Sequence, residues 1–156
     1  MKMAFLVLIA AASAEQQQKI SSARYLLGSW KCEHTVGTSS GSYTTTYATL
    51  LGDLWLKQTY DFPDNKAEAL IGYNPQRKYW VRFFVNSEGQ YFAIRMTETG
   101  SNWTWKYVSF SSDRKPETAE PDATFTKRSD NEYTIDGPSY EKDGARVTEH
   151  HVCKKR

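Results

Sequence analysis

The sequence predicts an all-β protein, a closed antiparallel up-and-down barrel of about ten strands with a short N-terminal helix. About ten short runs rich in Thr, Tyr, Trp and Phe follow one another, as pleated strands favour. Tight turns separate these runs, and no helix long enough to be a crossover lies between them. Neighbouring strands are therefore expected to be antiparallel. The only two cysteines, Cys32 and Cys153, lie in the first and last runs. A disulfide between them would close the sheet and remove its edges.

The chain begins with a segment typical of an export signal. Lys2 is followed by an apolar run, and Ala12-Ser13-Ala14 has the small residues that a signal peptidase recognises. The run is shorter than the roughly 20 residues that span a bilayer, which leaves a membrane anchor as the alternative. We predict a signal peptide over residues 1–14, one domain over residues 15–156, and a secreted or periplasmic protein. An oxidising compartment lets the cysteine pair persist as a disulfide, with two buried free thiols as the alternative.

Residues 15–27 are the one segment with helical spacing, because Ile20, Ala23 and Leu27 recur every three to four residues. After Gly28 the period changes to two. The expected strands cover residues 29–36, 43–51, 54–61, 67–73, 78–85, 90–97, 103–110, 124–128, 132–136 and 145–153. Turn residues separate them, for example residues 37–41, 137–138 and 143–144. Residues 111–122, which contain two prolines, are expected to form the longest loop.

The proposed disulfide would also fix the register between the first and last strands. If Cys32 lies opposite Cys153, antiparallel pairing places His34 opposite His151. Side chains alternate between the two faces of a strand, so His150 points away from His151. The large apolar Trp30 indicates that the other face is the barrel interior. That face carries Trp30, Cys32, His34, Glu149, His151 and Cys153.

The two inward histidines form a candidate metal or haem site. Neutral imidazoles about 5 Å apart across a strand pair, with a carboxylate nearby, are ligands for zinc, copper or haem iron. The more ordinary interpretation is a hydrogen-bonded polar pair at the mouth of the barrel. A zinc site using both cysteines and both histidines would compete with the disulfide. We therefore keep a metal site at His34 and His151 as an alternative and expect no cofactor.

Aromatic residues make up 14% of the chain, which favours a binding cavity inside the barrel. Such a cavity would take an apolar or amphipathic ligand and present an arginine to its carboxylate. An ordinary core with outward-pointing arginines is the alternative. The residues expected to line the cavity are Trp30, His34, Tyr79, Arg82, Phe83, Arg95, Trp103, Trp105 and His151.

Charge and motifs exclude several classes of function. The chain has 20 Lys and Arg against 18 Asp and Glu, which gives a net charge of +2. This charge is too small to indicate binding to nucleic acid or to an anionic membrane. It contains no nucleophile elbow, phosphate-binding loop or metalloprotease histidine pair. We therefore expect a carrier or binding protein for a small apolar ligand, not an enzyme, and a monomer or weak dimer.

Two short motifs resemble those of known barrels. Residues 26–30, Leu-Leu-Gly-Ser-Trp, resemble the leucine-glycine-x-tryptophan opening of the calycins, in which the tryptophan plugs the closed end. Residues 72–75, Gly-Tyr-Asn-Pro, are similar to the glycine-tyrosine-aspartate-proline hairpin of lipocalin-like bacterial domains of unknown function, with Asn74 replacing the aspartate. This resemblance covers roughly residues 26–153. It implies a calycin-like barrel that carries small hydrophobic molecules, without a defined reaction.

The chain is also similar to nitrobindins, ten-stranded barrels that hold haem through a histidine near the C-terminal strand. His151 or His150 stands near the corresponding place. This second resemblance implies a haem-binding barrel as the alternative function.

Overall fold

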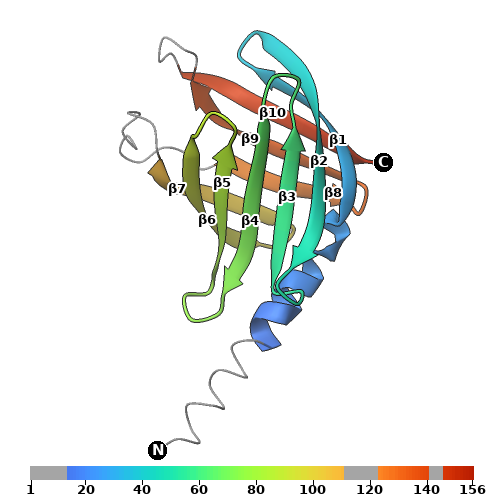
Figure 1. Cartoon of the computed structure of the whole chain (residues 1–156), viewed down its shortest axis with the longest axis vertical. Coiled ribbons are helices and arrows are strands. Elements are labelled where there is room, and N and C mark those ends of the chain that lie inside the picture. Colours follow the sequence, from blue (N-terminus) through green and yellow to red (C-terminus); the bar gives the residue numbers. More distant parts are fainter. Residues whose placement is uncertain (1–13, 111–122, 141–145) are drawn as a thin grey trace, which may run out of the picture.

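The chain forms a closed barrel of antiparallel strands with a helix at one end, as the computed structural model shows (Figure 1). The structure describes residues 14–110, 123–140 and 146–156. A helix over residues 14–22 and a 3-10 turn, η1 (Arg24–Leu26), precede the sheet. The strands are β1 (Gly28–Val36), β2 (Ser39–Leu50), β3 (Trp55–Asp61), β4 (Lys66–Asn74), β5 (Tyr79–Asn86), β6 (Tyr91–Thr99), β7 (Asn102–Phe110), β8 (Ala123–Ser129), β9 (Glu132–Tyr140) and β10 (Arg146–Lys155). The predicted fold class is confirmed.

Each strand pairs with its neighbours in sequence, and β1 pairs with β10 to complete the circle. This order leaves the sheet without a free edge. The register between β1 and β10 is the predicted one, with Cys32 opposite Cys153 and His34 opposite His151. A disulfide joins Cys32 and Cys153, whose Cα atoms are 4.1 Å apart.

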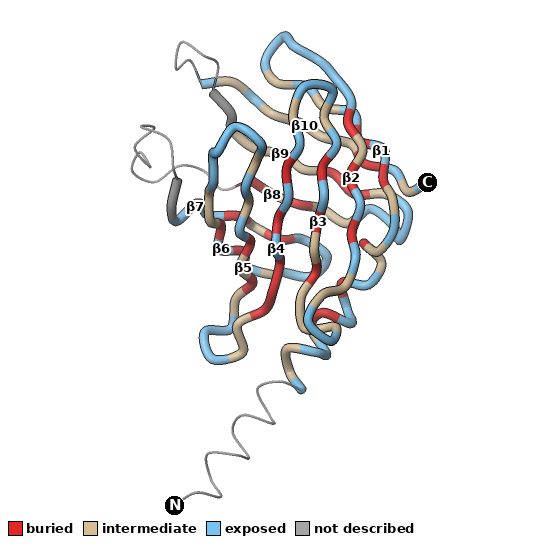
Figure 2. Tube along the Cα trace, in the orientation of Figure 1, coloured by how far each residue is buried: buried red, intermediate tan, exposed pale blue. Residues whose placement is uncertain are grey.

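The core lies inside the barrel, and buried and exposed positions alternate along the strands (Figure 2). At one end of the barrel the N-terminal segment contributes Ile20, Ala23 and Leu26, all fully buried against the core. The fully buried Trp30 donates a hydrogen bond from Nε1 to the carbonyl of Leu26 at 2.6 Å. These contacts close this end of the barrel, which we call the helix end.

Two segments expected to be turns belong to strands, and these predictions are wrong. Residues 39–41 open β2, where Ser39 pairs with Val36 and Gly41 with His34, because backbone pairing with β1 overrides their weak strand propensity. Gly137 and Pro138 lie inside β9, opposite Glu149 and Thr148 of β10. A Cβ at Gly137 would lie 2.6 Å from that of Ala123, so glycine is needed there for a close approach.

Three expectations concern residues outside the described part of the chain. They are most of the export signal, the long loop over residues 111–122 and the turn over residues 143–144. Among the described residues, no helical segment has the length and apolar character needed to cross a membrane.

Candidate functional site

The two ends of the barrel differ in how far solvent reaches the inward-pointing side chains. Near the helix end, inward residues such as Trp30, Trp80 and Tyr133 are fully buried. At the opposite end, residues that also point inward are partly exposed. They include His34, Phe62, Phe84, Phe92, Ile135, Glu149 and His151. The interior is therefore closed at the helix end and reachable by solvent at the other, which we call the open end.

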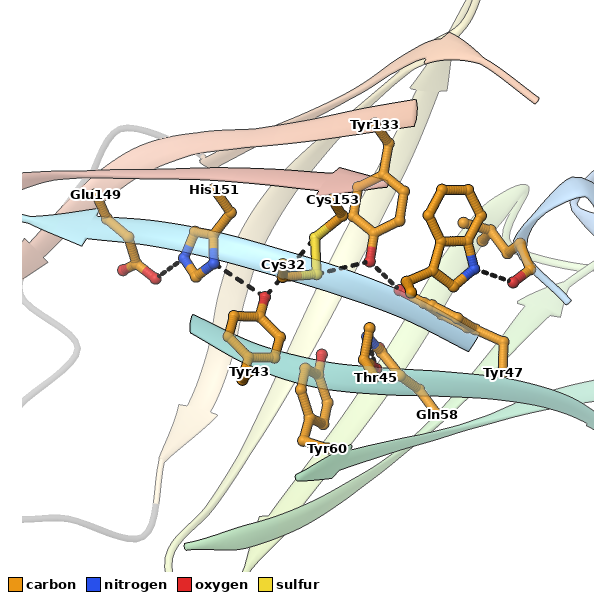
Figure 3. The surroundings of a disulfide bond; sticks show 12 residues. Cys32, Tyr43, Thr45, Tyr47, Gln58, Tyr60, Tyr133, Glu149, His151 and Cys153 are labelled. Atoms are coloured by element: carbon orange, nitrogen blue, oxygen red, sulfur yellow. Dashed lines mark hydrogen bonds and ion pairs between the residues drawn. A yellow bond between two sulfur atoms is a disulfide. The ribbon is translucent and has the colours of Figure 1, made fainter. Parts of the chain in front are cut away.

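The disulfide marks the boundary between these two halves of the interior. Cys32 and Cys153 are fully buried, and the hydroxyl groups of Tyr133 and Tyr43 lie 3.8 Å and 4.0 Å from their sulfurs (Figure 3). On the side of the helix end, the hydroxyls of Tyr133 and Tyr47 are hydrogen-bonded at 3.2 Å. The disulfide thus holds β1 against β10, with hydrogen-bonded hydroxyl groups of the interior on both sides of it.

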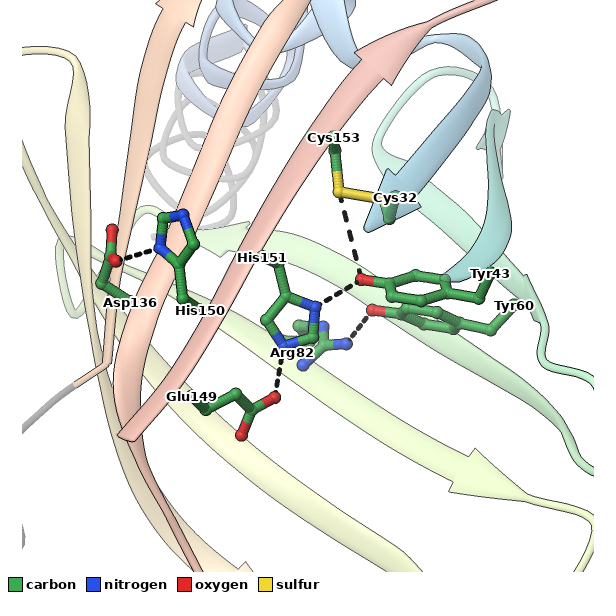
Figure 4. Close-up of polar contacts among 9 residues, drawn as sticks. All are labelled: Cys32, Tyr43, Tyr60, Arg82, Asp136, Glu149, His150, His151 and Cys153. Atoms are coloured by element: carbon green, nitrogen blue, oxygen red, sulfur yellow. Dashed lines mark hydrogen bonds and ion pairs between the residues drawn. A yellow bond between two sulfur atoms is a disulfide. The ribbon is translucent and has the colours of Figure 1, made fainter. Parts of the chain in front are cut away.

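The histidine pair lies on the inner face, on the open side of the disulfide. The rings of His34 and His151 are stacked, with centroids 5.5 Å apart. His34 owes its space to Gly41 on β2, because a Cβ there would lie 2.8 Å from Cε1 of the imidazole. His150 points to the other face, where Nδ1 lies 2.5 Å from Oδ1 of Asp136 (Figure 4). The predicted arrangement of the three histidines is confirmed.

Both ring nitrogens of His151 already have protein partners. Nε2 contacts Oε1 of Glu149, and Nδ1 lies 2.9 Å from the hydroxyl of Tyr43. An ionised carboxylate only accepts hydrogen bonds, so Nε2 carries the proton and the Nδ1 of a neutral ring accepts from Tyr43. The side chain of His151 is 12% exposed. This arrangement fixes the ring between a carboxylate and a phenol.

The surroundings of His34 favour its neutral form. Burial lowers its pKa below the ordinary value, the neighbouring His151 lowers it further, and Glu149 opposes the shift. Its Nδ1 is buried, with no hydrogen-bond partner among the described residues. The contribution of His151 to this shift is the repulsion expected between two facing imidazoles if both were protonated.

Arg82 is a charged group that lies in the buried part of the interior. It projects inward from β5, is only 4% exposed, and donates a hydrogen bond to the hydroxyl of Tyr60 (Figure 4). Its guanidinium carbon lies 5.1–5.7 Å from the centroids of four aromatic rings, which belong to Tyr60, Phe84, Phe92 and Trp105. Cation–π contacts of this kind stabilise a positive charge that is removed from water.

The tyrosines on this side of the interior stay neutral. Burial raises the pKa of both Tyr43 and Tyr60, so each keeps its hydroxyl hydrogen at neutral pH. The indole Nε1 of Trp105 is buried, and among the described residues it has no hydrogen-bond partner. A buried donor left without an acceptor is costly, so an acceptor brought by a ligand would satisfy it. Arg82 and Trp105 together present donors of the kind that recognise anions, and we call this pair the anion-binding corner.

The predicted cavity residues divide between the two faces. Trp30, His34, Arg82, Trp103, Trp105 and His151 point into the barrel, as expected. Tyr79, Phe83 and Arg95 lie on the outer face, and the prediction that they line the interior is wrong. Both faces of β5 are aromatic, so the alternation alone could not decide which face points inward.

Three interior residues were not anticipated as site residues, namely Tyr43, Phe84 and Phe92. The spacing of Tyr43 and Tyr47, with Thr45 between them, is a period-two signal that indicates an inward face on β2. Phe84 and Phe92 face each other on β5 and β6, with stacked rings 4.3 Å apart. Their position follows once β5 is assigned its correct face.

Two open hollows of about 380 and 350 Å³ lie on the outer surface near the helix end. The first is lined by side chains of the N-terminal helix, together with Arg24 and Asp53. The second surrounds Trp55. Neither is lined by Arg82 or by the histidine pair, so the two hollows do not belong to the anion-binding corner.

The arrangement does not fit a metal or haem ligand at the histidine pair. Coordination of His151 needs a free ring nitrogen, whereas Tyr43 and Glu149 occupy both. The disulfide removes both cysteines as zinc ligands. Within the described ranges, no group of three or more His, Cys, Asp or Glu side chains is placed to hold a metal ion.

Comparison with models of known protein families gives no match, and no curated protein has a significantly similar sequence.

Proposed function

We propose that this protein is an exported binding protein for a small amphipathic anion that enters the barrel through its open end. The observation that carries the proposal is the anion-binding corner, in which the guanidinium carbon of the buried Arg82 lies 5.1 Å from the ring centroid of Trp105, whose indole nitrogen is buried without a hydrogen-bond partner among the described residues. A guanidinium presents donors in a fork that matches a carboxylate, and the indole adds a further donor. A closed barrel is compatible with such a ligand-binding role.

The surroundings of the corner suit an apolar body attached to the acidic group. Phe84 and Phe92 lie between Arg82 and the open end, and both are only partly buried. Burying an apolar chain against such rings contributes roughly 25 cal/mol per Å² of surface removed from water. We therefore propose an aliphatic or aromatic carboxylate as the ligand class, with its acidic group innermost.

We propose binding without catalysis. Tyr43 and Tyr60 have raised pKa values, so both phenols stay protonated at neutral pH and are not poised to act as bases. The imidazole of His151 is held between Glu149 and Tyr43 and does not present a free nitrogen to a substrate.

Export is the second part of the proposal. Residues 1–14 have the pattern of a signal peptide, and the Cys32–Cys153 disulfide is of the kind that persists in an oxidising compartment. The secreted protein is expected to begin at Glu15.

Calorimetric titration of the purified barrel with fatty acids, retinoic acid and aromatic carboxylates tests the proposal. We expect a carboxylate to bind at least tenfold more tightly than the alcohol of the same carbon skeleton. Arg82→Met should remove that preference, whereas Arg77→Met, in the exposed turn between β4 and β5, should leave it intact. Trp105→Phe should weaken binding of the carboxylate and leave the affinity for the alcohol unchanged.

Two results would overturn the proposed function. One is the absence of heat and of tryptophan fluorescence change with every compound, while circular dichroism shows a folded barrel. The other is equal binding of acid and alcohol by the wild-type protein, because the corner would then not recognise an anion.

A further inference from the structure

The outer face of the barrel carries an exposed apolar surface over β4, β5 and β6. Large apolar side chains are well exposed there: Leu70 is 39% exposed, Phe83 48% and Val85 52%. Single exposed apolar residues are ordinary, but a contiguous group on a soluble surface marks an interaction site. The question is what covers this group.

The strand register arranges the outward side chains as three rows of three. Leu70, Phe83 and Ala93 form the middle row across β4, β5 and β6. The row nearer the open end contains Glu68, Val85 and Tyr91. The row nearer the helix end contains Gly72, Val81 and Arg95, and the ring of Trp55 covers Gly72. We call these nine residues the outer grid, and Phe83 is at its centre.

The charges of the outer grid occupy opposite corners. Glu68 stands at one corner and Arg95 at the corner diagonally across, and the other seven positions carry no charge. Glu68 forms an ion pair with Lys57 at 2.7 Å. Both side chains are well exposed, so this ion pair contributes little to stability. Arg95 is exposed, with its guanidinium 5.7 Å from the ring of Tyr79. Both charges are accessible to a partner.

We propose that the outer grid is a dimer interface in which two copies of this chain pack face to face. A two-fold axis in the plane of the interface, running along the diagonal from Gly72 through Phe83 to Tyr91, makes the grid complementary to itself. It places Glu68 of each copy against Arg95 of the other. The same axis brings Leu70 against Val81 and Val85 against Ala93, while the two Phe83 rings meet near the axis.

This self-complementarity is the reason for choosing a second copy as the occupant. Two-fold interfaces are isologous, so each position of a surface that pairs with itself must be complementary to the position that lies opposite it across the axis. The grid meets that condition in both its charges and its apolar positions. An anionic lipid surface would be attracted by Arg95 but repelled by Glu68, and the grid has no net charge to attract it.

The interface is independent of the proposed ligand site. Val81 and Phe83 point outward from β5, whereas Arg82 between them points inward. A charge changed on the outer grid therefore leaves the interior untouched. Failure of dimerisation and failure of ligand binding would appear in different variants.

Sedimentation velocity over a range of concentrations tests the proposal. We expect a reversible dimer that Glu68→Arg or Arg95→Glu weakens at least tenfold, because each change sets like charges together twice across the axis. The double variant Glu68→Arg/Arg95→Glu restores opposite charges in every pair and should dimerise again. Glu33→Arg, an exposed change on β1, is the control and should leave the dimer intact.

A cysteine at the centre provides a test that does not depend on charge. Phe83→Cys should be joined to its counterpart by a short bifunctional maleimide, since the two positions face each other near the axis at roughly the 10 Å spacing of packed sheets, while the exposed control Lys31→Cys should not. A wild-type protein that is monomeric at all concentrations would overturn the proposal. A folded double variant that stays monomeric, or single variants that dimerise normally, would do the same.

Discussion

His34 lies directly across the β1–β10 pair from His151, and their rings stack 5.5 Å apart on the inner face of the barrel. The two rings nevertheless have different surroundings. His151 is fixed between Glu149 and Tyr43, whereas the buried Nδ1 of His34 has no hydrogen-bond partner in the described part of the chain. Protonation of His34 would place a positive charge in this partly buried site beside a second imidazole.

The stability of the barrel should therefore decrease as the pH falls. Burial lowers the pKa of folded His34, so the unfolded chain binds more protons below its ordinary pKa, and the free energy of unfolding rises with pH there. We expect His34→Gln to reduce this slope between about pH 5 and pH 7, measured by urea unfolding. Thr35→Ala, an exposed change on the same strand that removes no titratable group, is the control and should leave the slope unchanged. An unaltered slope in His34→Gln would contradict the assignment.

Loss of the disulfide should strongly destabilise the protein. The bond joins residues 121 positions apart, and closing so long a loop restricts the unfolded chain by about 4–5 kcal/mol in the entropy model, an upper figure. We expect Cys32→Ala/Cys153→Ala and the reduced wild-type protein to lose similar free energies of unfolding in urea. Adding reductant to the double variant is the control and should have no effect. Two thiols that alkylate freely in the native protein would exclude the bond.

Trp30 should contribute to stability in two separable ways. It is fully buried with its ring centroid 4.8 Å from that of Tyr133, and truncation of such a side chain to alanine costs about 3–5 kcal/mol. Trp30→Phe keeps much of the packing but leaves the Leu26 carbonyl without its donor, which costs about 1–3 kcal/mol. Thermal and urea unfolding measure both. Equal losses for the two variants would mean that the hydrogen bond dominates.

Gly137 should not tolerate a side chain unless Ala123 becomes smaller. A Cβ at Gly137 would lie 2.6 Å from Cβ of Ala123 and 2.9 Å from its Cα, so β8 and β9 would have to separate. We expect Gly137→Ala to cost about 1–3 kcal/mol in urea unfolding. Gly137→Ala/Ala123→Gly should recover part of that loss, because only the backbone contact remains. A double variant less stable than the single one would contradict this explanation.

The sequence by itself determined the closure of the barrel and the pairing of its ends. Period-two runs without a crossover helix allow only antiparallel neighbours, and a chain with two cysteines has one possible disulfide. Once Cys32 is set opposite Cys153, the antiparallel rule places His34 opposite His151 with no further information. This part of the candidate site was therefore predictable from local rules alone.

Only the tertiary structure decided which face of β5 points inward and which polar groups meet there. Both faces of that strand carry aromatic residues, and Arg82 and Phe83 differ in environment only because neighbouring strands fix the orientation of β5. Gly137 and Pro138 likewise indicate a turn in the sequence, whereas in the structure they pair with β10 inside β9. Alternation gives the relative placement of neighbouring side chains, whereas the choice between inside and outside depends on contacts with strands distant in sequence.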